Sequence, residues 1–326
     1  MKRLLTVLSL SLFTVVYSFC DNKLTAPDEE IPAPGYEGSK VPLNDVVAVT
    51  VRFNPPYAGG STISKLVLLD YNNPTRYKIV GDLYMFAEYP RFSPDKSKIL
   101  YVDRGKGSRH DPAFLLYDVQ NDSIKVLDSP MHPMGHLPLW KYDCSGFYYT
   151  NSYFAGTMFF RFSTKIREWI SSEKGYIYYP LDIKGTDTLI VNGKNTEGDE
   201  KIRGVYFTDH EGSCLTLINN PYLETSKIFG KFLRWSNDLG LIVYVENDTT
   251  LGGTKISVTN SDGSYYRCYT SGEFNDTSPV WGPESKTILF ERGRIIYIID
   301  IETGDISEFA TSYFIYGAHG LSYPDY

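Results

Sequence analysis

One short unit recurs along the sequence and constrains the fold more than any other feature. Its clearest copy is residues 90–102, PRFSPDKSKILYV, in which an apolar residue, Phe92, precedes a tight turn and then a strand. In the turn, Pro94 fixes φ at about −65°, and the Asp95 carboxylate can accept hydrogen bonds from the backbone that follows. Residues 98–102 are aliphatic and aromatic enough to form a half-buried strand.

Four further copies of this unit are spaced along the chain, at residues 138–149, 179–191, 233–244 and 279–290. Their large apolar residues, which we call plugs, fall about 40–55 residues apart, the repeat length of four-stranded propeller blades. The plugs are Phe92, Trp140, Leu181, Trp235 and Trp281. A second apolar run follows each copy and is predicted to be the third strand of its blade, at residues 113–118, 158–162, 204–209, 255–259 and 295–300.

The remaining blade is divided between the two ends of the chain. Residues 46–51 and 65–70 are predicted to be its second and third strands, but no plug and turn precede them. The missing piece lies at the other end, where residues 320–325 are a degenerate copy of residues 91–95. We therefore expect residues 313–322 to supply the innermost strand of the first blade. The fold class is all-β, a six-bladed propeller of four-stranded antiparallel blades, closed in a way that protects sheet edges.

The N-terminal residues predict export. Lys2 and Arg3 precede an apolar run at residues 4–16 that is too short for a stable membrane span. The residues between this leader and the first strand are rich in proline, glycine and acidic side chains and have no periodicity. The predicted boundaries are therefore residues 1–20 for a signal peptide, 21–44 for a flexible tether and 45–326 for the propeller.

The C-terminal end of the leader has two interpretations. Small residues before Phe19 suit cleavage by signal peptidase, with release of the protein, whereas Cys20 followed by Asp21 and Asn22 is typical of a bacterial lipoprotein acceptor. Phe19 occupies a position that normally holds a small residue in lipoproteins. Both interpretations place the protein outside the cytoplasm, in the bacterial periplasm or anchored to the outer membrane, with a lipid on Cys20 as its only contact with the membrane.

The composition argues against several functional classes. The net charge of −7 gives no basic footprint for nucleic acid. The sequence contains neither a Gly-x-Ser-x-Gly nucleophile motif nor a phosphate-binding glycine motif, so we predict no cofactor and no catalytic residue.

Cys214 and Cys268 follow turn glycines in consecutive repeats, and we predict two unpaired, partly buried thiols there in preference to a disulfide.

A cluster of polar residues is predicted at one mouth of the propeller axis. Positions four residues before the plugs Phe92, Trp140 and Trp235 hold Glu88, His136 and Lys231, which the repeat places at equivalent points of different blades. Neighbouring polar residues complete the candidate ligand site, which comprises Glu88, Arg91, His132, His136, Lys231 and His319. Histidines beside a carboxylate suit a polar ligand or, as an alternative, a transition metal held by His132, His136 and His319. Loop histidines flanked by proline are usually solvated, so we predict no metal.

The turns with an aromatic residue before Ser-Pro-Asp and a following Lys-Ile-Leu-Tyr strand resemble the repeats of TolB-type six-bladed propellers. The resemblance covers about residues 45–325, and the turn proline is lost in the copies at Lys141, Asp182 and Ser236. A complete ring with little else predicts a non-enzymatic, monomeric binding module for a protein or glycan of the cell envelope, and the resemblance suggests an envelope protein as the partner. Because some similar propellers cleave acidic polysaccharides with a metal and axial histidines, the alternative is a metal-assisted polysaccharide lyase, with Glu88 or Arg91 assisting.

Overall fold

The structure is a computed structural model, and the described residues all belong to the compact unit Ala33–Tyr326. They are residues 46–53, 63–74, 76–81, 87–103, 113–127, 138–151, 156–170, 175–195, 203–224, 228–293, 295–310 and 318–322. The side chains at 52–53, 63, 151, 195, 228–231 and 318–322 are outside the description. The predicted leader and tether, including Cys20, also lie outside it. Among the described residues, no helix is long and apolar enough to cross a membrane.

The strands form six four-stranded antiparallel sheets, and the predicted fold class is confirmed. From the innermost strand outward, blade 1 is β24 (Ala318–Ser322), β1 (Val46–Phe53), β2 (Ile63–Asp70) and β3 (Tyr77–Val80), and blade 2 is β4 (Ala87–Phe92), β5 (Lys98–Asp103), β6 (Ala113–Asp118) and β7 (Ser123–Leu127). Blade 3 is β8 (Leu139–Trp140), β9 (Gly146–Asn151), β10 (Gly156–Arg161) and β11 (Arg167–Ile170).

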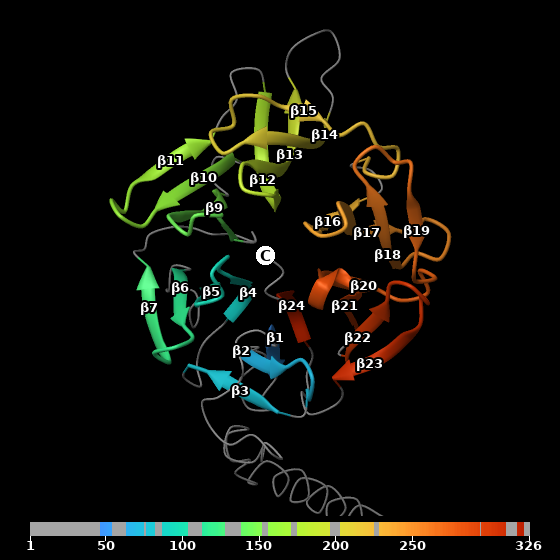
Figure 1. Ribbon diagram of the computed structural model, residues 1–326, viewed down its shortest axis with the longest axis horizontal. Helices are drawn as coiled ribbons and strands as arrows, with labels where there is room; N and C mark the ends of the chain where they lie inside the picture. Colours follow the sequence, from blue (N-terminus) through green and yellow to red (C-terminus); the bar gives the residue numbers. More distant parts are fainter. Residues whose placement is uncertain are drawn as a thin grey trace, which may run out of the picture. The chain divides into compact units, whose positions relative to one another are not determined.

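The second half of the chain repeats this plan. Blade 4 is β12 (Gly175–Lys184), β13 (Thr188–Asn195), β14 (Arg203–Asp209) and β15 (Thr216–Leu217), and blade 5 is β16 (Ile228–Trp235), β17 (Leu241–Asn247), β18 (Thr254–Asn260) and β19 (Tyr266–Cys268). Blade 6 is β20 (Asp276–Trp281), β21 (Thr287–Arg292), β22 (Ile295–Asp300) and β23 (Ile306–Ala310), with a short 3-10 turn, η2 (Pro283–Ser285), after its first strand. The innermost strands contact one another in sequence around a ring (Figure 1).

The C-terminal strand closes this ring as predicted. β24 pairs antiparallel with β1, with Leu321 opposite Val49 and Ser322 opposite Ala48. β24 also contacts β4 of blade 2 and β20 of blade 6. Head and tail are thus held in one sheet, and blade 1 has the same four strands as the others.

The core lies between the blades, because alternate side chains of each strand face opposite neighbours. In β5, Ile99 and Tyr101 pack toward blade 1, whereas Leu100 and Val102 pack toward blade 3. All four are essentially buried, and full burial of each such side chain stabilises the fold by about 1.5–3 kcal/mol. The sheets are therefore apolar on both faces, which explains why their strands read as continuous apolar runs.

The turn after the innermost strand keeps its backbone geometry in blade 3, where the proline is lost. In blade 2, the Asp95 carboxylate accepts hydrogen bonds from the Ser93 hydroxyl (2.6 Å) and the Ser97 amide (3.0 Å), as predicted for this turn. A residue with positive φ follows the aspartate, Lys96 at 60° in blade 2 and Cys144 at 56° in blade 3. The repeated element is thus a backbone conformation that several residue types can adopt.

The cysteines correct one prediction. Cys214 and Cys268 are unpaired, as expected, but both are exposed and not partly buried. Cys268 lies on β19, the outermost strand of blade 5, and Cys214 lies just before β15, the outermost strand of blade 4. Burial falls toward the outer edge of each blade, because the packing between blades is densest near the inner strands.

Candidate functional site

The predicted axial site remains a prediction, because most of its side chains lie outside the described residues. Glu88 and Arg91 are on the innermost strand β4, on either side of a register shift, and both are largely buried. The backbone of His319 pairs with Thr50 in blade 1. Lys231 belongs to the innermost strand of blade 5. The side chains of His319 and Lys231, and all of His132 and His136, lie outside the description.

The described residues instead form a pocket between blades 2 and 3, with a volume of about 300 Å³. Its polar lining comes from the turn and strands of blade 2 and from the turns of blade 3. Its apolar lining comes from the core cluster between the same two blades. The lining residues are Ser93, Asp95, Lys98, Leu116, Lys125, Val126, Leu127, Trp140, Cys144, Phe160, Phe162 and Lys165.

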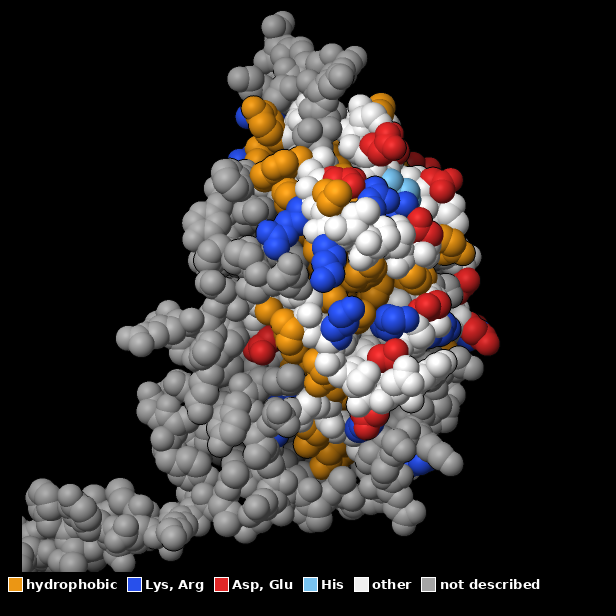
Figure 2. All heavy atoms as spheres, turned by 90° about the vertical axis from the view of Figure 1, so that its left-hand side faces the viewer, with side chains coloured by type: hydrophobic (Ala, Val, Ile, Leu, Met, Phe, Trp, Pro, Cys, Tyr) orange, Lys and Arg blue, Asp and Glu red, His pale blue; other side chains and the backbone are white. Residues whose placement is uncertain are grey.

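Three lysines from separate elements reach this pocket. Lys98 begins β5, Lys125 lies on the outermost strand β7, and Lys165 is in the hairpin between β10 and β11. Cα pairing places Lys125 opposite Leu116, and both line the pocket together. Figure 2 views the molecule from the side of these outer strands and shows lysine and arginine side chains gathered around a strip of hydrophobic ones.

The pocket carries excess positive charge. Lys98, Lys125 and Lys165 form no ion pair within the described part of the chain; Lys98 donates a hydrogen bond to the Ser97 hydroxyl (2.9 Å). The pocket lining contains one carboxylate, that of Asp95. Burial alone would raise its pKa, but hydrogen bonds from Ser93 and Ser97, together with the charge of Lys98, outweigh burial and lower the pKa of Asp95. Burial raises the pKa of the Cys144 thiol, so that wall of the pocket is neutral at physiological pH.

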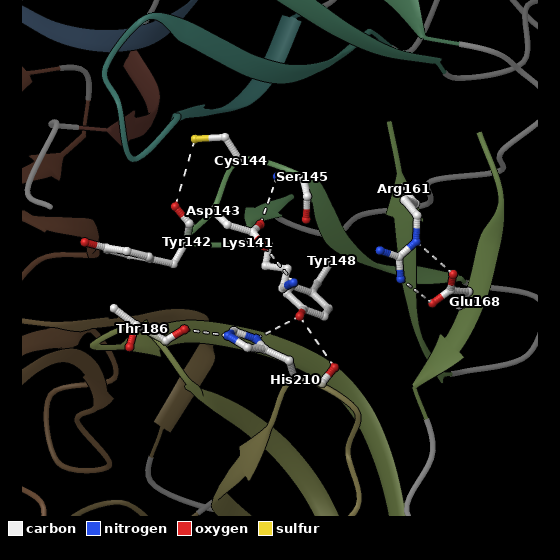
Figure 3. Close-up of polar contacts among 10 residues, drawn as sticks. All are labelled: Lys141, Tyr142, Asp143, Cys144, Ser145, Tyr148, Arg161, Glu168, Thr186 and His210. Carbon is white, nitrogen blue, oxygen red and sulfur yellow. Dashed lines mark hydrogen bonds and ion pairs between the residues drawn. The ribbon is translucent and has the colours of Figure 1, made fainter. Parts of the chain in front are cut away.

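The cations on the other side of the blade 3 turn are paired, which distinguishes them from the pocket lysines (Figure 3). Lys141 lies 2.8 Å from the Asp143 carboxylate. Arg161 donates two hydrogen bonds to Glu168, both at 3.1 Å. These pairs compensate the charges of Lys141 and Arg161. Among the described residues, the pocket between blades 2 and 3 is therefore a place where a ligand would meet more lysines than carboxylates.

A histidine joins blade 3 to blade 4 in the same view. The Nδ1 atom of His210 lies 2.8 Å from the Tyr148 hydroxyl, and its Nε2 atom lies 2.6 Å from the carbonyl oxygen of Thr186 (Figure 3). A carbonyl oxygen only accepts, so Nε2 carries a proton and donates to Thr186. Burial raises the pKa of Tyr148 strongly, which keeps its hydroxyl protonated. We assign this contact to the joint between the blades.

Sequence reasoning missed the lysine pocket. Lys98 lies within the clearest copy of the repeat, whereas Lys125 and Lys165 lie in the outer halves of two different blades. A signal was available in the order of the blades, since consecutive blades are neighbours and turn residues of both lie at the same end. The lengths of the outer strands, which decide whether these lysines meet, do not follow from the repeat.

No model of a known protein family matches the chain, and no curated protein matches it. Solved structures do match. The crystal structure of TolB from Acinetobacter baumannii has a TM-score of 0.64 at 15% identity, and the match covers 88% of this chain and 68% of that one. A putative TolB from Agrobacterium tumefaciens has a TM-score of 0.59 at 14% identity, covering 82% and 96%. The chain has a TolB-like propeller fold.

A second kind of protein shares the architecture. A chain of a nidogen/laminin complex matches this TolB-like propeller with a TM-score of 0.62 at 8% identity, covering 85% of this chain and 97% of that one. Identities this low establish the fold and not the function, because propellers of one architecture carry unrelated activities.

Proposed function

We propose that this TolB-like propeller is an exported, non-enzymatic binding module that recognises a protein or glycan of the bacterial cell envelope. The predicted signal peptide at residues 1–20 supports export, with release after cleavage or a lipid on Cys20 as the two possible ends. The closed ring supports binding, because it presents turns and outer strands on a rigid frame. In this proposal the protein acts as a monomer.

The observation that carries the proposal is the pocket between blades 2 and 3. Its lining joins apolar side chains to three lysines and a single carboxylate, that of Asp95. Most ligand sites have such an apolar lining with a few polar groups that fix orientation. The ligand that this chemistry favours carries negative charge and a small apolar part.

Fractionation of cells that express the full-length chain tests the location. We expect the protein in the envelope fraction, and we expect it in the cytoplasm when residues 2–20 are deleted. Metabolic labelling with a fatty acid separates the two ends of the leader, since only a lipoprotein incorporates label at Cys20 and loses it in Cys20→Ala. Cytoplasmic retention of the intact chain would contradict export.

Affinity capture tests the binding role. The mature full chain, immobilised through a C-terminal tag, is incubated with envelope extract under mild conditions. We expect retention of a partner that an unrelated immobilised propeller does not retain. Failure to enrich any protein or glycan over that control would contradict a binding role.

A further inference from the structure

The pocket lies beside an open strand edge. β7 ends its sheet, so one of its two backbone edges has no partner strand in the described part of the chain. Three residues of β7, Lys125, Val126 and Leu127, line the pocket. Unpaired edges of this kind accept an added strand from an extended peptide, through main-chain hydrogen bonds.

The charges select what can pair there. A lysine on an edge strand normally discourages pairing with another strand. Here Lys125 is joined by Lys98 and Lys165 around one pocket, so the repulsion becomes attraction when the incoming segment is acidic. Other outer strands also carry a cation, Lys78 on β3 and Arg267 on β19. Lys78 pairs with Asp122, and Arg267 donates to the carbonyl oxygen of Ile301. β7 differs in that its lysine lines a pocket together with two more lysines.

The lining favours an apolar side chain over a sugar ring. Trp140 and Phe160 are almost fully buried, at 1% and 2% exposed, and Phe162 is half-buried, so Phe162 is the one aromatic ring of this lining that a sugar could reach. Aliphatic groups of Leu116 and Leu127 contribute the rest of the apolar wall. Lysine supplies a point charge on a flexible stem, which suits carboxylates at several positions along a peptide and not one fixed planar group.

We propose that an extended acidic peptide segment of a partner protein pairs with the edge of β7 and places one apolar side chain in the pocket between blades 2 and 3. Its carboxylates lie against Lys98, Lys125 and Lys165. This inference rests on the proposed binding function and names the ligand class of the same pocket. It differs from the axial site predicted from sequence, because β7 is the outermost strand of its blade.

A synthetic probe tests the proposal. The probe is a short capped peptide of alternating glutamate and valine with a fluorophore, titrated with the full-length mature protein while anisotropy is recorded. We expect saturable binding that weakens as salt rises, because exposed charges are screened. The same peptide with glutamine in place of glutamate is expected to bind at least about tenfold more weakly. Equal binding of the two peptides would overturn the proposal.

Two substitutions locate the site without disturbing the fold. Lys125 is exposed, and Lys165 has a positive φ of 56°, which glycine adopts without strain. Lys125→Ala combined with Lys165→Gly is expected to weaken probe binding by about tenfold. Lys286→Ala, which removes an exposed lysine of blade 6, is the matched control and is expected to change nothing. Equal effects of the two sets would overturn the proposed location.

The probe itself tests the pairing and the ligand class. N-methylation of alternate peptide bonds removes main-chain donors, so we expect binding to be lost; unchanged binding would overturn pairing with β7. A uronic-acid trisaccharide that displaces the probe at lower concentration than the unlabelled peptide does would overturn the choice of a peptide.

Capture from envelope extract with the double variant separates the two proposals. If the variant retains the wild-type partner undiminished, the binding function stands and the pocket inference fails. If no partner is captured although the probe binds in a lysine-dependent way, the pocket inference stands and the envelope function fails.

Discussion

The indole nitrogen of Trp140 in blade 3 donates a hydrogen bond to the backbone carbonyl oxygen of Arg91 in blade 2, at 3.0 Å. Trp281 in blade 6 makes the same contact with the carbonyl of Arg234 in blade 5, at 3.2 Å. In both cases the donor is a plug, and the acceptor immediately precedes the plug of the previous blade. The repeat therefore specifies a joint between blades as well as the blade itself.

Loss of this joint should destabilise the ring. In Trp140→Phe, the buried carbonyl of Arg91 loses its indole donor and a space opens beside it, so we expect the free energy of unfolding to fall by about 1–3 kcal/mol. Urea denaturation measures the change. Trp169→Phe is the control, since Trp169 lies on the outer strand β11 and is 49% exposed; it should change stability by less than about 0.5 kcal/mol. Equal losses in the two variants would contradict the role of the joint.

The inner half of each blade could be predicted from sequence, because its signals are local and repeat. Each plug, turn and following strand can be recognised from a few consecutive residues. The degenerate copy near Leu321 was enough to predict the closure of blade 1. The contacts between blades are harder to predict from the sequence. The Ser64 hydroxyl donates to the carbonyl of Ala87 (2.8 Å), and Thr254 makes the equivalent contact with Asp276 (2.6 Å). Serine and threonine are common at many positions, so neither residue type predicts a contact between blades.

The candidate site shows why function is harder to predict than fold. The axial site was inferred from positions that the repeat makes equivalent, and it stays a prediction. The pocket depends on where two outer strands and a hairpin end, and these features drift between blades. Lys125 and Lys165 lie in different blades, so their proximity is a property of packing between repeats that neither repeat contains by itself.

The turn of blade 2 contains a removable strain. Lys96 has a φ of 60°, a conformation that costs an ordinary residue about 1–2 kcal/mol and glycine very little. Lys96→Gly also makes the unfolded chain more flexible, which offsets part of the gain, so we expect a net stabilisation of about 0.5–1 kcal/mol, measured as a higher Tm. Lys286 occupies a nearby turn position in blade 6 with a φ of −79°. Lys286→Gly should therefore show no gain; a rise in Tm there would contradict the explanation.

A buried ion pair holds the second strand of blade 6 to the first. Arg292 donates to both carboxylate oxygens of Asp276, at 2.7 and 2.9 Å, and the Asp276 side chain is 1% exposed. Arg292→Met leaves that carboxylate buried without its cation, so we expect a loss of about 3–5 kcal/mol.

The double variant Asp276→Asn with Arg292→Met tests whether the pair is the cause. Because Asp276→Asn removes the carboxylate that Arg292→Met leaves without a cation, the double variant should be more stable than the sum of the two single losses predicts. Urea denaturation of all four proteins gives this coupling energy. Strict additivity would show that the two side chains contribute independently.

The ion pair between Lys141 and Asp143 should give stability that depends on pH. Burial opposes ionisation of Asp143, but hydrogen bonds from Lys141 and Ser145 outweigh it and lower the pKa to about 2. The unfolded value is about 3.9, so the charged carboxylate stabilises the fold above about pH 4, and this contribution is lost as the pH falls toward 2. The side chain is 52% exposed, and screening by solvent limits the contribution to about 1 kcal/mol or less.

Asp143→Asn keeps an acceptor for the Ser145 amide and removes only the charge. The variant should therefore be less stable than the wild type at pH 6, and the difference should shrink between pH 4 and pH 2.5 in urea denaturation. A difference that stays constant over this range would show that the charge of Asp143 contributes nothing to the fold.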